Sequence, residues 1–377
     1  MRAWDLRYKR ASTMKKRIVI TLKDITESGG GERVGANLAN AFALNLGYEV
    51  QIVSFFKSGA KPFYPLDSRI SCIYLCNRPA KAKNAFINLF NKTIFRAWLI
   101  FKAQRFATQS DIILANDGWF VPLFKSGSRS KGRFFVRLWH INAPKKARKK
   151  LRLFDALVIL SEREIQRWQR YHSNINAIPN FLPDIPQTST NHSQKVVLSV
   201  GRLSSEKGFL RLLDIWKIVR EHIASSQDNL SQWKLIIVGD GVLKSEIESK
   251  INALNLSQSV ILKPFTKDIE REYLGASIYA MASHFEGFPM VLLESTSYGL
   301  APLSFDIATG PSDIIEHNKS GFLILDNDLE GYARHLIALM SDESMRANFG
   351  KEAKRIVSER FGKESVINLW EKLFTNF

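Results

Sequence analysis

Short apolar runs alternate with longer segments of helical periodicity along almost the whole chain. In the first half the runs rich in β-branched residues are RIVITL (17–22), EVQIVSFF (49–56), ISCIYL (70–75), DIILAN (111–116), RFFVRLW (133–139) and DALVIL (155–160). The pattern restarts with VVLSVG (196–201), KLIIVGDG (234–241), SVILKP (259–264), SIYAMAS (277–283), APLSFD (301–306) and GFLIL (321–325). This alternation predicts two successive sets of βαβ units, each forming a doubly wound parallel sheet.

A stretch rich in Pro, Ser and Thr, residues 179–194, separates the two sets and is typical of a linker. A chain of 377 residues is also too long for one ordinary core. We therefore expect an N-terminal domain over 14–184 and a C-terminal domain over 185–377. We further expect a last helix at 363–377 that packs back on the N-terminal domain, and a disordered extension over 1–13. Ligands of such sheets bind at the carboxyl ends of the strands.

Composition adds a strong asymmetry of charge. The formal net charge is +18, and residues 1–190 hold 33 Lys and Arg against 12 Asp and Glu. Such a basic half indicates an anionic partner, either nucleic acid or the anionic leaflet of a membrane, or else a generally solvated basic surface. No apolar run is long enough to cross a bilayer, and Cys72 and Cys76 in a strand-like segment fit a reducing compartment. A peripheral, cytoplasmic protein is the expectation.

The helical segment 81–106 mixes aromatic residues with Lys and Arg, and the basic run PKKARKKLR (144–152) lies further along the chain. Aromatic and basic residues on one helix favour an interfacial helix at a membrane surface. A helix that packs its apolar side on the sheet and solvates its basic side is an equally good interpretation.

Glycine-rich turns follow several predicted strands. Gly30 and Gly31 belong to ESGGGERV (27–34), where a helix begins and free N–H groups favour an anion. The spacing matches neither G-x-G-x-x-G nor a P-loop. Gly239 and Gly241 of VGDGV would either line a nucleotide or form a structural turn. VGRLSSEKG (200–208) adds Arg202 and Lys207, two cations suited to a diphosphate or simply exposed on a loop.

The segment HFEGFPMVLLESTSYG (284–299) follows a predicted strand and contains two glutamates. Glu286 lies on a loop, whereas Glu294 lies about a turn and a half inside the next helix. The free N–H groups of Met290, Val291 and Leu292 at the helix start would receive phosphate. Glycoside hydrolysis needs two carboxyl groups converging on one bond, which this spacing does not favour. The pair therefore indicates a clamp on an elongated ligand.

Together these motifs resemble the retaining GT-B glycosyltransferases of family 4, above all in the E-x7-E motif Glu286 to Glu294 and in GPSDIIEHNKSGFL (310–323). The resemblance implies two Rossmann-like domains facing across a cleft. It implies that Arg202 and Lys207 bind the donor diphosphate and that Glu294 binds the ribose. The transferred sugar would contact Glu286, the backbone of Gly287, Phe288 and Pro289, and His140 of FVRLWHIN. A structural, hydrogen-bonded His140 is the alternative.

The implied reaction moves a hexose or N-acetylhexosamine from a UDP-sugar to a lipid-linked, lipopolysaccharide or polysaccharide acceptor with retention. The leaving diphosphate would take the acceptor proton, so no protein nucleophile is expected. No Asp-x-Asp motif is present, and we expect neither metal nor cofactor besides the donor itself. Competing hypotheses are a nucleic-acid-binding protein and a nucleotide-sugar-binding homologue without catalysis.

Overall fold

The computed structural model describes residues 17–79, 94–106, 112–123, 134–140, 149–225 and 230–376. The chain forms two compact units. The N-terminal unit comprises Met1–Ile178 with Val366–Phe377, and the C-terminal unit comprises Pro179–Ser365. The expected extension over 1–13, the first part of the aromatic and basic segment (81–93) and the basic residues 144–148 lie outside the described residues.

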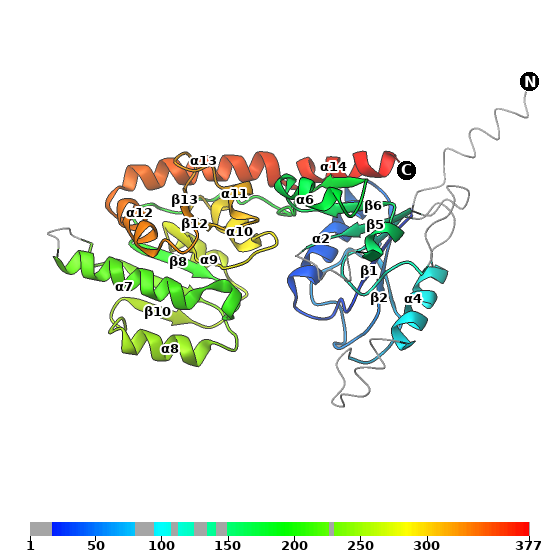
Figure 1. Cartoon of the computed structure of the whole chain (residues 1–377), viewed down its shortest axis with the longest axis horizontal. Helices are drawn as coiled ribbons and strands as arrows, with labels where there is room; N and C mark the ends of the chain where they lie inside the picture. The colour runs from blue at the N-terminus through cyan, green and yellow to red at the C-terminus, as the bar shows by residue number, and fades with distance from the viewer. Residues whose placement is uncertain are drawn as a thin grey trace, which may run out of the picture. The chain divides into compact units, whose positions relative to one another are not determined.

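The N-terminal unit is built on a parallel sheet with the strand order β3-β2-β1-β4-β5-β6-β7. Its strands are β1 (Arg17–Leu22), β2 (Glu49–Ser54), β3 (Ser71–Tyr74), β4 (Ile112–Ala115), β5 (Phe134–Leu138), β6 (Ala156–Ile159) and β7 (Ile175–Ala177). Its helices are α2 (Gly30–Leu44), α4 (Ile94–Phe106), α6 (Ile165–Gln169) and α14 (Lys363–Thr375), with 3-10 turns η2 (Lys149–Leu153) and η3 (Glu162–Glu164) (Figure 1).

The C-terminal unit is built on a second parallel sheet with the order β10-β9-β8-β11-β12-β13. Its strands are β8 (Val196–Val200), β9 (Lys234–Val238), β10 (Val260–Lys263), β11 (Ile278–Met281), β12 (Ala301–Asp306) and β13 (Phe322–Leu325). Its helices are α7 (Phe209–Ser225), α8 (Lys244–Ala253), α9 (Glu270–Leu274), α10 (Met290–Ser297), α11 (Pro311–Ile314), α12 (Leu329–Ser341) and α13 (Glu343–Phe361), with the 3-10 turn η4 (Ser205–Lys207).

The predicted fold class of two doubly wound parallel sheets is confirmed. Strands such as β4 and β11 are buried along their whole length because helices cover both faces of each sheet. The apolar runs therefore marked the strands well. β7 was not predicted, because three residues flanked by polar positions give no pattern.

The stretch 179–194 is packed against the C-terminal unit rather than extended away from it. The Leu182 N–H donates to the carbonyl of Phe361 at 3.0 Å, and the Thr190 N–H donates to that of Tyr298 at 2.8 Å. Phe181, Leu182 and Thr190 are buried. The Pro-rich composition thus indicates irregular backbone here, but not a free linker.

The last helix, α14, supplies aromatic side chains to the core of the N-terminal unit. Trp370 and Phe374 lie with ring centroids 5.6 Å and 5.3 Å from that of Phe42 on α2. All three side chains are at most 1% exposed. Residues from the two ends of the sequence therefore form one packed core.

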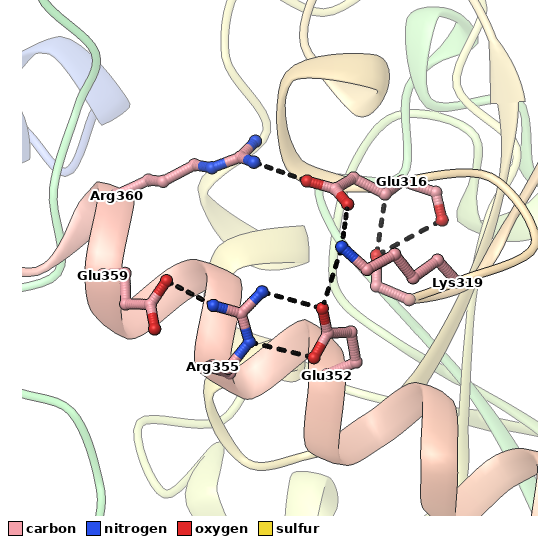
Figure 2. A network of polar contacts seen from close by, with 7 residues as sticks. Glu316, Lys319, Glu352, Arg355, Glu359 and Arg360 are labelled. Carbon is pink, nitrogen blue, oxygen red and sulfur yellow. Dashed lines mark hydrogen bonds and ion pairs between the residues drawn. The ribbon is translucent and has the colours of Figure 1, made fainter.

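A network of charged side chains ties α13 to the turn between α11 and β13 (Figure 2). Its members are Glu316, Lys319, Glu352, Arg355, Glu359 and Arg360. Glu352 accepts from Arg355 and Lys319, and these contacts lower the pKa of its carboxyl to about 2. Asn318 in this turn has φ 62°, a left-handed conformation that asparagine adopts more readily than most residues, and the ion pairs hold the turn on α13.

Candidate functional site

An ion pair joins two loops at the carboxyl ends of β8 and β11. Lys207 Nζ lies 2.7 Å from Glu286 Oε1 and 2.9 Å from Oε2. The side chain of Glu286 is 8% exposed and that of Lys207 is 23% exposed, so the pair is largely withdrawn from water. The structure thus brings together two of the predicted site residues, 79 positions apart in sequence.

Further hydrogen bonds fix the position of Glu286. The Ser283 hydroxyl donates to Oε1 at 2.6 Å, and the Thr309 hydroxyl donates to the backbone carbonyl of Glu286 at 2.6 Å. Gly310 follows with φ +99°, and a Cβ there would lie 2.5 Å from Cδ of Pro289. Loops after β11 and β12 therefore hold the carboxylate in one orientation.

Arg211 on α7 supports the same loop and was missed by the sequence analysis. Its Nε donates to the carbonyl of Ala282 at 2.6 Å, its Nη2 donates to the carbonyl of Ser283, and its Nη1 pairs with Asp326 at 2.8 Å. The guanidinium carbon lies 4.1 Å from the ring centroid of Phe305. An arginine in an apolar helical segment gave no signal that it would bind strand-end carbonyls.

Arg202 lies directly after β8 and is exposed, whereas Lys207 is partly buried. Both cations act on Glu206, whose carboxyl accepts a hydrogen bond from Ser204 at 2.6 Å. The Ser204 hydrogen bond first, and the two cations less strongly, lower the pKa of Glu206. The predicted cationic pair is therefore present on one loop, with Arg202 open to solvent.

Glycines let these loops approach one another closely. A Cβ on Gly208, whose φ is +66°, would lie 1.8 Å from the carbonyl oxygen of Ala282. A Cβ on Gly239 or Gly241 would lie 1.9 Å or 2.4 Å from the carbonyl oxygen of Gly201 or Leu203. Gly239 and Gly241 thus have a packing role that accounts for them as glycines. Their predicted contact with a nucleotide stays a prediction.

The start of α10 differs in one respect from the prediction. The Leu292 N–H donates to the carbonyl of Pro289 at 3.0 Å, so it is not available to a phosphate as expected. Among the described residues no acceptor is recorded for the N–H groups of Met290 and Val291. Phe288 packs its side chain on Phe361, with ring centroids 5.5 Å apart, and so offers only backbone atoms to the loop surface.

Glu294 lies inside α10, is 9% exposed, and accepts a hydrogen bond from the hydroxyl of Tyr273 at 3.1 Å. The ring of Tyr273 is stacked on that of Tyr298, with centroids 5.3 Å apart. The charges of both glutamates act on Tyr279 of β11. Burial first, and then the charges of Glu286 and Glu294, raise the pKa of Tyr279 well above its usual value. The two carboxylates therefore share one neighbourhood but have different hydrogen-bond partners.

A second group of predicted residues lies at the carboxyl end of the N-terminal sheet. Gly30 and Gly31 form the first turn of α2, where a Cβ on either would meet no atom within 4 Å. The side-chain amide of Asn116, directly after β4, donates to the carbonyl of Gly31 at 2.8 Å. The same amide lies 3.1 Å from Nε2 of His140. Gly31 and His140 are thus linked through a residue that no motif indicated.

Charged side chains surround Gly30, Gly31 and His140. Burial raises the pKa of Asp117, whose carboxylate accepts from the backbone N–H groups of Trp119 and Lys23. Burial also lowers the pKa of Arg137 to about 10. Burial, and then the charge of Arg137, lower the pKa of His140 to about 4. His140 is therefore neutral at physiological pH.

The described part of the aromatic and basic segment is the helix α4. Leu99 and Ile100 are buried in the core, whereas Trp98 and Phe101 are 51% and 52% exposed. Lys102 Nζ lies 5.4 Å from the ring centroid of Trp98, and the guanidinium of Arg105 lies 5.9 Å from that of Phe101. The helix thus buries one side and presents aromatic rings with cations on another, so elements of both interpretations are present.

The described residues include no helix long and apolar enough to cross a bilayer. Within the same residues, no three His, Cys, Asp or Glu side chains are grouped as a metal site would need. Cys72 and Cys76 are both free thiols.

Residues 181–356 match the family described as Glycosyl transferases group 1. The amylovoran biosynthesis glycosyltransferase AmsD of Erwinia amylovora is 29% identical over 95% of this chain and 99% of its own. A Campylobacter jejuni α-1,4-N-acetyl-D-galactosaminyltransferase, whose name specifies the acceptor GalNAc-α-(1→4)-GalNAc-α-(1→3)-diNAcBac-PP-undecaprenol, is 25% identical over 87% of this chain and 90% of its own.

Among solved structures, a mutant of S. aureus TarM, in complex with fondaparinux, α-GlcNAc-glycerol and UDP, superposes with a TM-score of 0.75. It is 16% identical over 95% of this chain and 99% of TarM, and at that identity it shows the fold, the GT-B pairing of two Rossmann-like domains. Residues 181–356 thus match the group 1 glycosyltransferases, and the whole chain is similar in sequence to glycosyltransferases and shares the fold of one.

Proposed function

We propose that this chain is a retaining glycosyltransferase that moves a hexose or an N-acetylhexosamine from a UDP-sugar to a lipid-linked or polysaccharide acceptor. The observation that carries the proposal is the buried ion pair Lys207–Glu286, fixed at the carboxyl ends of β8 and β11 with Arg202 exposed on the same loop. An enzyme that expels a diphosphate needs fixed positive charge where the negative charge develops.

The site residues would act as follows. Arg202, Lys207 and the N–H groups of Met290 and Val291 would bind the diphosphate. Glu294 would accept hydrogen bonds from the ribose hydroxyls. Lys207 carries three N–H donors, so contact with both oxygens of Glu286 leaves one for phosphate.

In the reaction, the bond between the anomeric carbon and the diphosphate oxygen breaks, and a bond from the acceptor hydroxyl forms on the same face. The hydroxyl proton passes to the departing diphosphate. The protein then needs neither a nucleophile nor a metal ion, because its own cations stabilise the leaving group. Glu286 and His140 would orient the sugar without moving a proton.

Names of the similar proteins support the choice of substrates. TarM was solved with UDP, and the Campylobacter relative is named for an undecaprenol-linked acceptor. A lipid-linked acceptor would be met at a membrane surface. We propose that the basic N-terminal unit attaches the enzyme to the anionic cytoplasmic face of the membrane through Trp98, Phe101 and their neighbouring cations. Nucleic-acid binding is not favoured, because it would leave the ion pair and its loop without a role.

The test is a panel of UDP-, GDP- and ADP-sugars, scored by thermal stabilisation and by slow donor hydrolysis. We expect UDP and one or more UDP-sugars to stabilise the protein. Arg202→Met should weaken UDP binding by about tenfold or more, because a charged hydrogen bond to phosphate is lost.

Lys217→Met is the matched control, since Lys217 pairs with Glu221 on the surface of α7 and should leave UDP binding unchanged. Stabilisation by oligonucleotides but by no nucleotide sugar would overturn the proposal. Binding of UDP-sugars without hydrolysis or transfer to any acceptor would favour a homologue without catalysis.

A further inference from the structure

We propose that Asn116 fixes the tautomer of His140, so that Nε2 carries the proton and Nδ1 presents a lone pair to the substrate. The inference rests on the proposed function, in which His140 contacts the transferred sugar. It assigns Asn116 as a positioning residue that acts through His140.

The hydrogen-bond pattern determines the orientation of the amide. Asn116 is 1% exposed, and its Nδ2 lies 2.8 Å from the carbonyl oxygen of Gly31. A backbone carbonyl can only accept, so the NH2 group must face Gly31 and Oδ1 must face His140. Oδ1 in turn can only accept, and it lies 3.1 Å from Nε2 of His140. Nε2 must therefore be the protonated nitrogen.

The opposite orientation of the amide is strongly disfavoured. Rotating the side-chain amide by half a turn would set Oδ1 against the Gly31 carbonyl, so that two acceptors would face each other. Even if His140 then changed tautomer and accepted from the NH2 group, the hydrogen bond to Gly31 would be lost inside a buried site. The backbone N–H of Asn116 donates to the carbonyl of Thr21 at 3.0 Å, which fixes the residue on β1. A Cβ on Gly35 would lie 3.2 Å from Nδ2, so α2 packs closely on the amide.

The protonation state of His140 follows from its surroundings. Among the described residues, the charged groups at this end of the sheet include Lys23, Glu32, Arg96, Asp117 and Arg137. Of these, Arg137 is the one whose charge acts on the imidazole. Burial and this positive charge hold the pKa of His140 at about 4. The ring is then neutral, with its proton on the side of Asn116.

A neutral ring with this tautomer suits the proposed reaction. No described residue donates to Nδ1, and in the proposed function a sugar hydroxyl donates to this atom. Glycosyl transfer develops positive charge at the anomeric carbon, as in other oxocarbenium-like transition states. A protonated His140 beside the sugar would oppose that charge, whereas a neutral acceptor does not.

The direct test is long-range proton–nitrogen NMR on the whole protein labelled with 15N-histidine at pH 7. The signals of His140 are assigned by their absence from His140→Gln. We expect the Nε2–H tautomer in the wild type and a mixture of tautomers in Asn116→Leu. His172 is the internal reference for the Nε2–H tautomer, because its Nδ1 accepts from the backbone N–H of Asn174 at 3.0 Å and its Nε2 donates to the carbonyl of Phe154 at 3.0 Å. An Nδ1–H tautomer in the wild type would overturn the inference.

Asn116→Asp tests the same inference if Asn116→Leu fails to fold. The aspartate keeps an acceptor for Nε2–H and adds a negative charge. We expect the tautomer to be preserved and the titration midpoint of His140 to rise by about 1–3 pH units. An unchanged midpoint would contradict the contact between the two side chains.

Activity separates this inference from the proposed function. In Asn116→Leu we expect kcat to fall while stabilisation by UDP is unchanged, because the proposed UDP-binding residues belong to the other unit. For Asn116→Asp, the pH below which the activity declines should be higher than it is for the wild type. If no donor is turned over, the proposed function fails whatever tautomer is found. If donor is turned over and Asn116→Leu keeps both the His140 tautomer and the kcat of the wild type, the inference fails but the proposed function does not.

Discussion

Glu286 and Glu294 differ in what holds them, and this difference can be measured. Glu286 accepts from a lysine and a serine, whereas Glu294 accepts from the hydroxyl of Tyr273. The first glutamate is thus tied to the cation proposed for the diphosphate. The second lies in a tyrosine-rich environment proposed for the ribose.

Substituting each glutamate by glutamine should therefore give opposite results. Glu286→Gln releases Lys207 toward the diphosphate, so UDP affinity should be kept or increased while kcat falls by about 100-fold. Glu294→Gln removes a charged acceptor, so UDP affinity should fall by about tenfold. Calorimetric titration with UDP and steady-state kinetics measure both quantities.

Glu359→Gln serves as the control, because Glu359 pairs only with surface Arg355 among the contacts described here and should leave both quantities unchanged. Equal losses of UDP affinity in Glu286→Gln and Glu294→Gln would contradict the division of roles.

At the residue scale, the sequence was most informative where a charged residue follows a strand. Arg202, Lys207 and Glu286 were predicted as site residues in this way, and their assignment stays a prediction. Arg211, Tyr273, Tyr279 and Asn116 were not, because their partners are set by which strands and helices become neighbours. Asn116 ends the apolar run DIILAN, where its amide gives no pattern until α2 packs beside β4.

At the scale of elements, apolar runs located the strands, but the helix α4 could not be interpreted from its pattern. Its buried residues are Leu99, Ile100 and Ala103, and its exposed aromatic residues are Trp98 and Phe101. Mixed aromatic and basic residues on such a short helix are compatible with packing on the sheet and with contact to a membrane. The helix buries these three side chains in the core and leaves the two aromatic rings at the surface.

Replacing the exposed rings should weaken attachment to anionic vesicles. The double variant Trp98→Ser and Phe101→Ser should reduce co-sedimentation with phosphatidylglycerol vesicles by about tenfold or more, since two buried aromatic rings are lost from the interface. Wild-type binding should also decrease as salt is added.

Phe265→Ser is the matched control, because Phe265 is 63% exposed but belongs to the less basic C-terminal unit. Equal binding of wild type and double variant, or binding to neutral vesicles alone, would refute the membrane role of α4.

The motif GPSDIIEHNKSGFL, which together with the E-x7-E motif carries the family resemblance, contains residues whose observed role is structural. Glu316 and Lys319 join α13, and the Ser320 hydroxyl accepts from the backbone N–H of Glu316 at 2.9 Å. A resemblance carried by such positions indicates a shared fold of the loop. It cannot by itself specify which sugar the site accepts.

At the scale of the whole molecule, the N-terminal unit depends on the last helix. Trp370 is 1% exposed, so Trp370→Ala should destabilise this unit by about 3–5 kcal/mol, whereas Leu369→Ala, at a position 42% exposed, should change it little. Hydrogen exchange should show faster opening in β1 and α2 and little change in β8 and β11. Faster hydrogen exchange in both units, or in neither unit, would contradict a core confined to the N-terminal unit.

The contribution of α14 to the N-terminal core also has a consequence for biosynthesis. A ribosome delivers residues 17–178 long before Trp370 and Phe374, so the unit made first lacks part of its core until α14 has been made. Synthesis of the C-terminal unit, Pro179–Ser365, is completed before the last core residues of the N-terminal unit are made. Of the two units, the one whose synthesis starts first is thus the one whose folding finishes last, and a chain cut before α14 would carry an incomplete N-terminal unit.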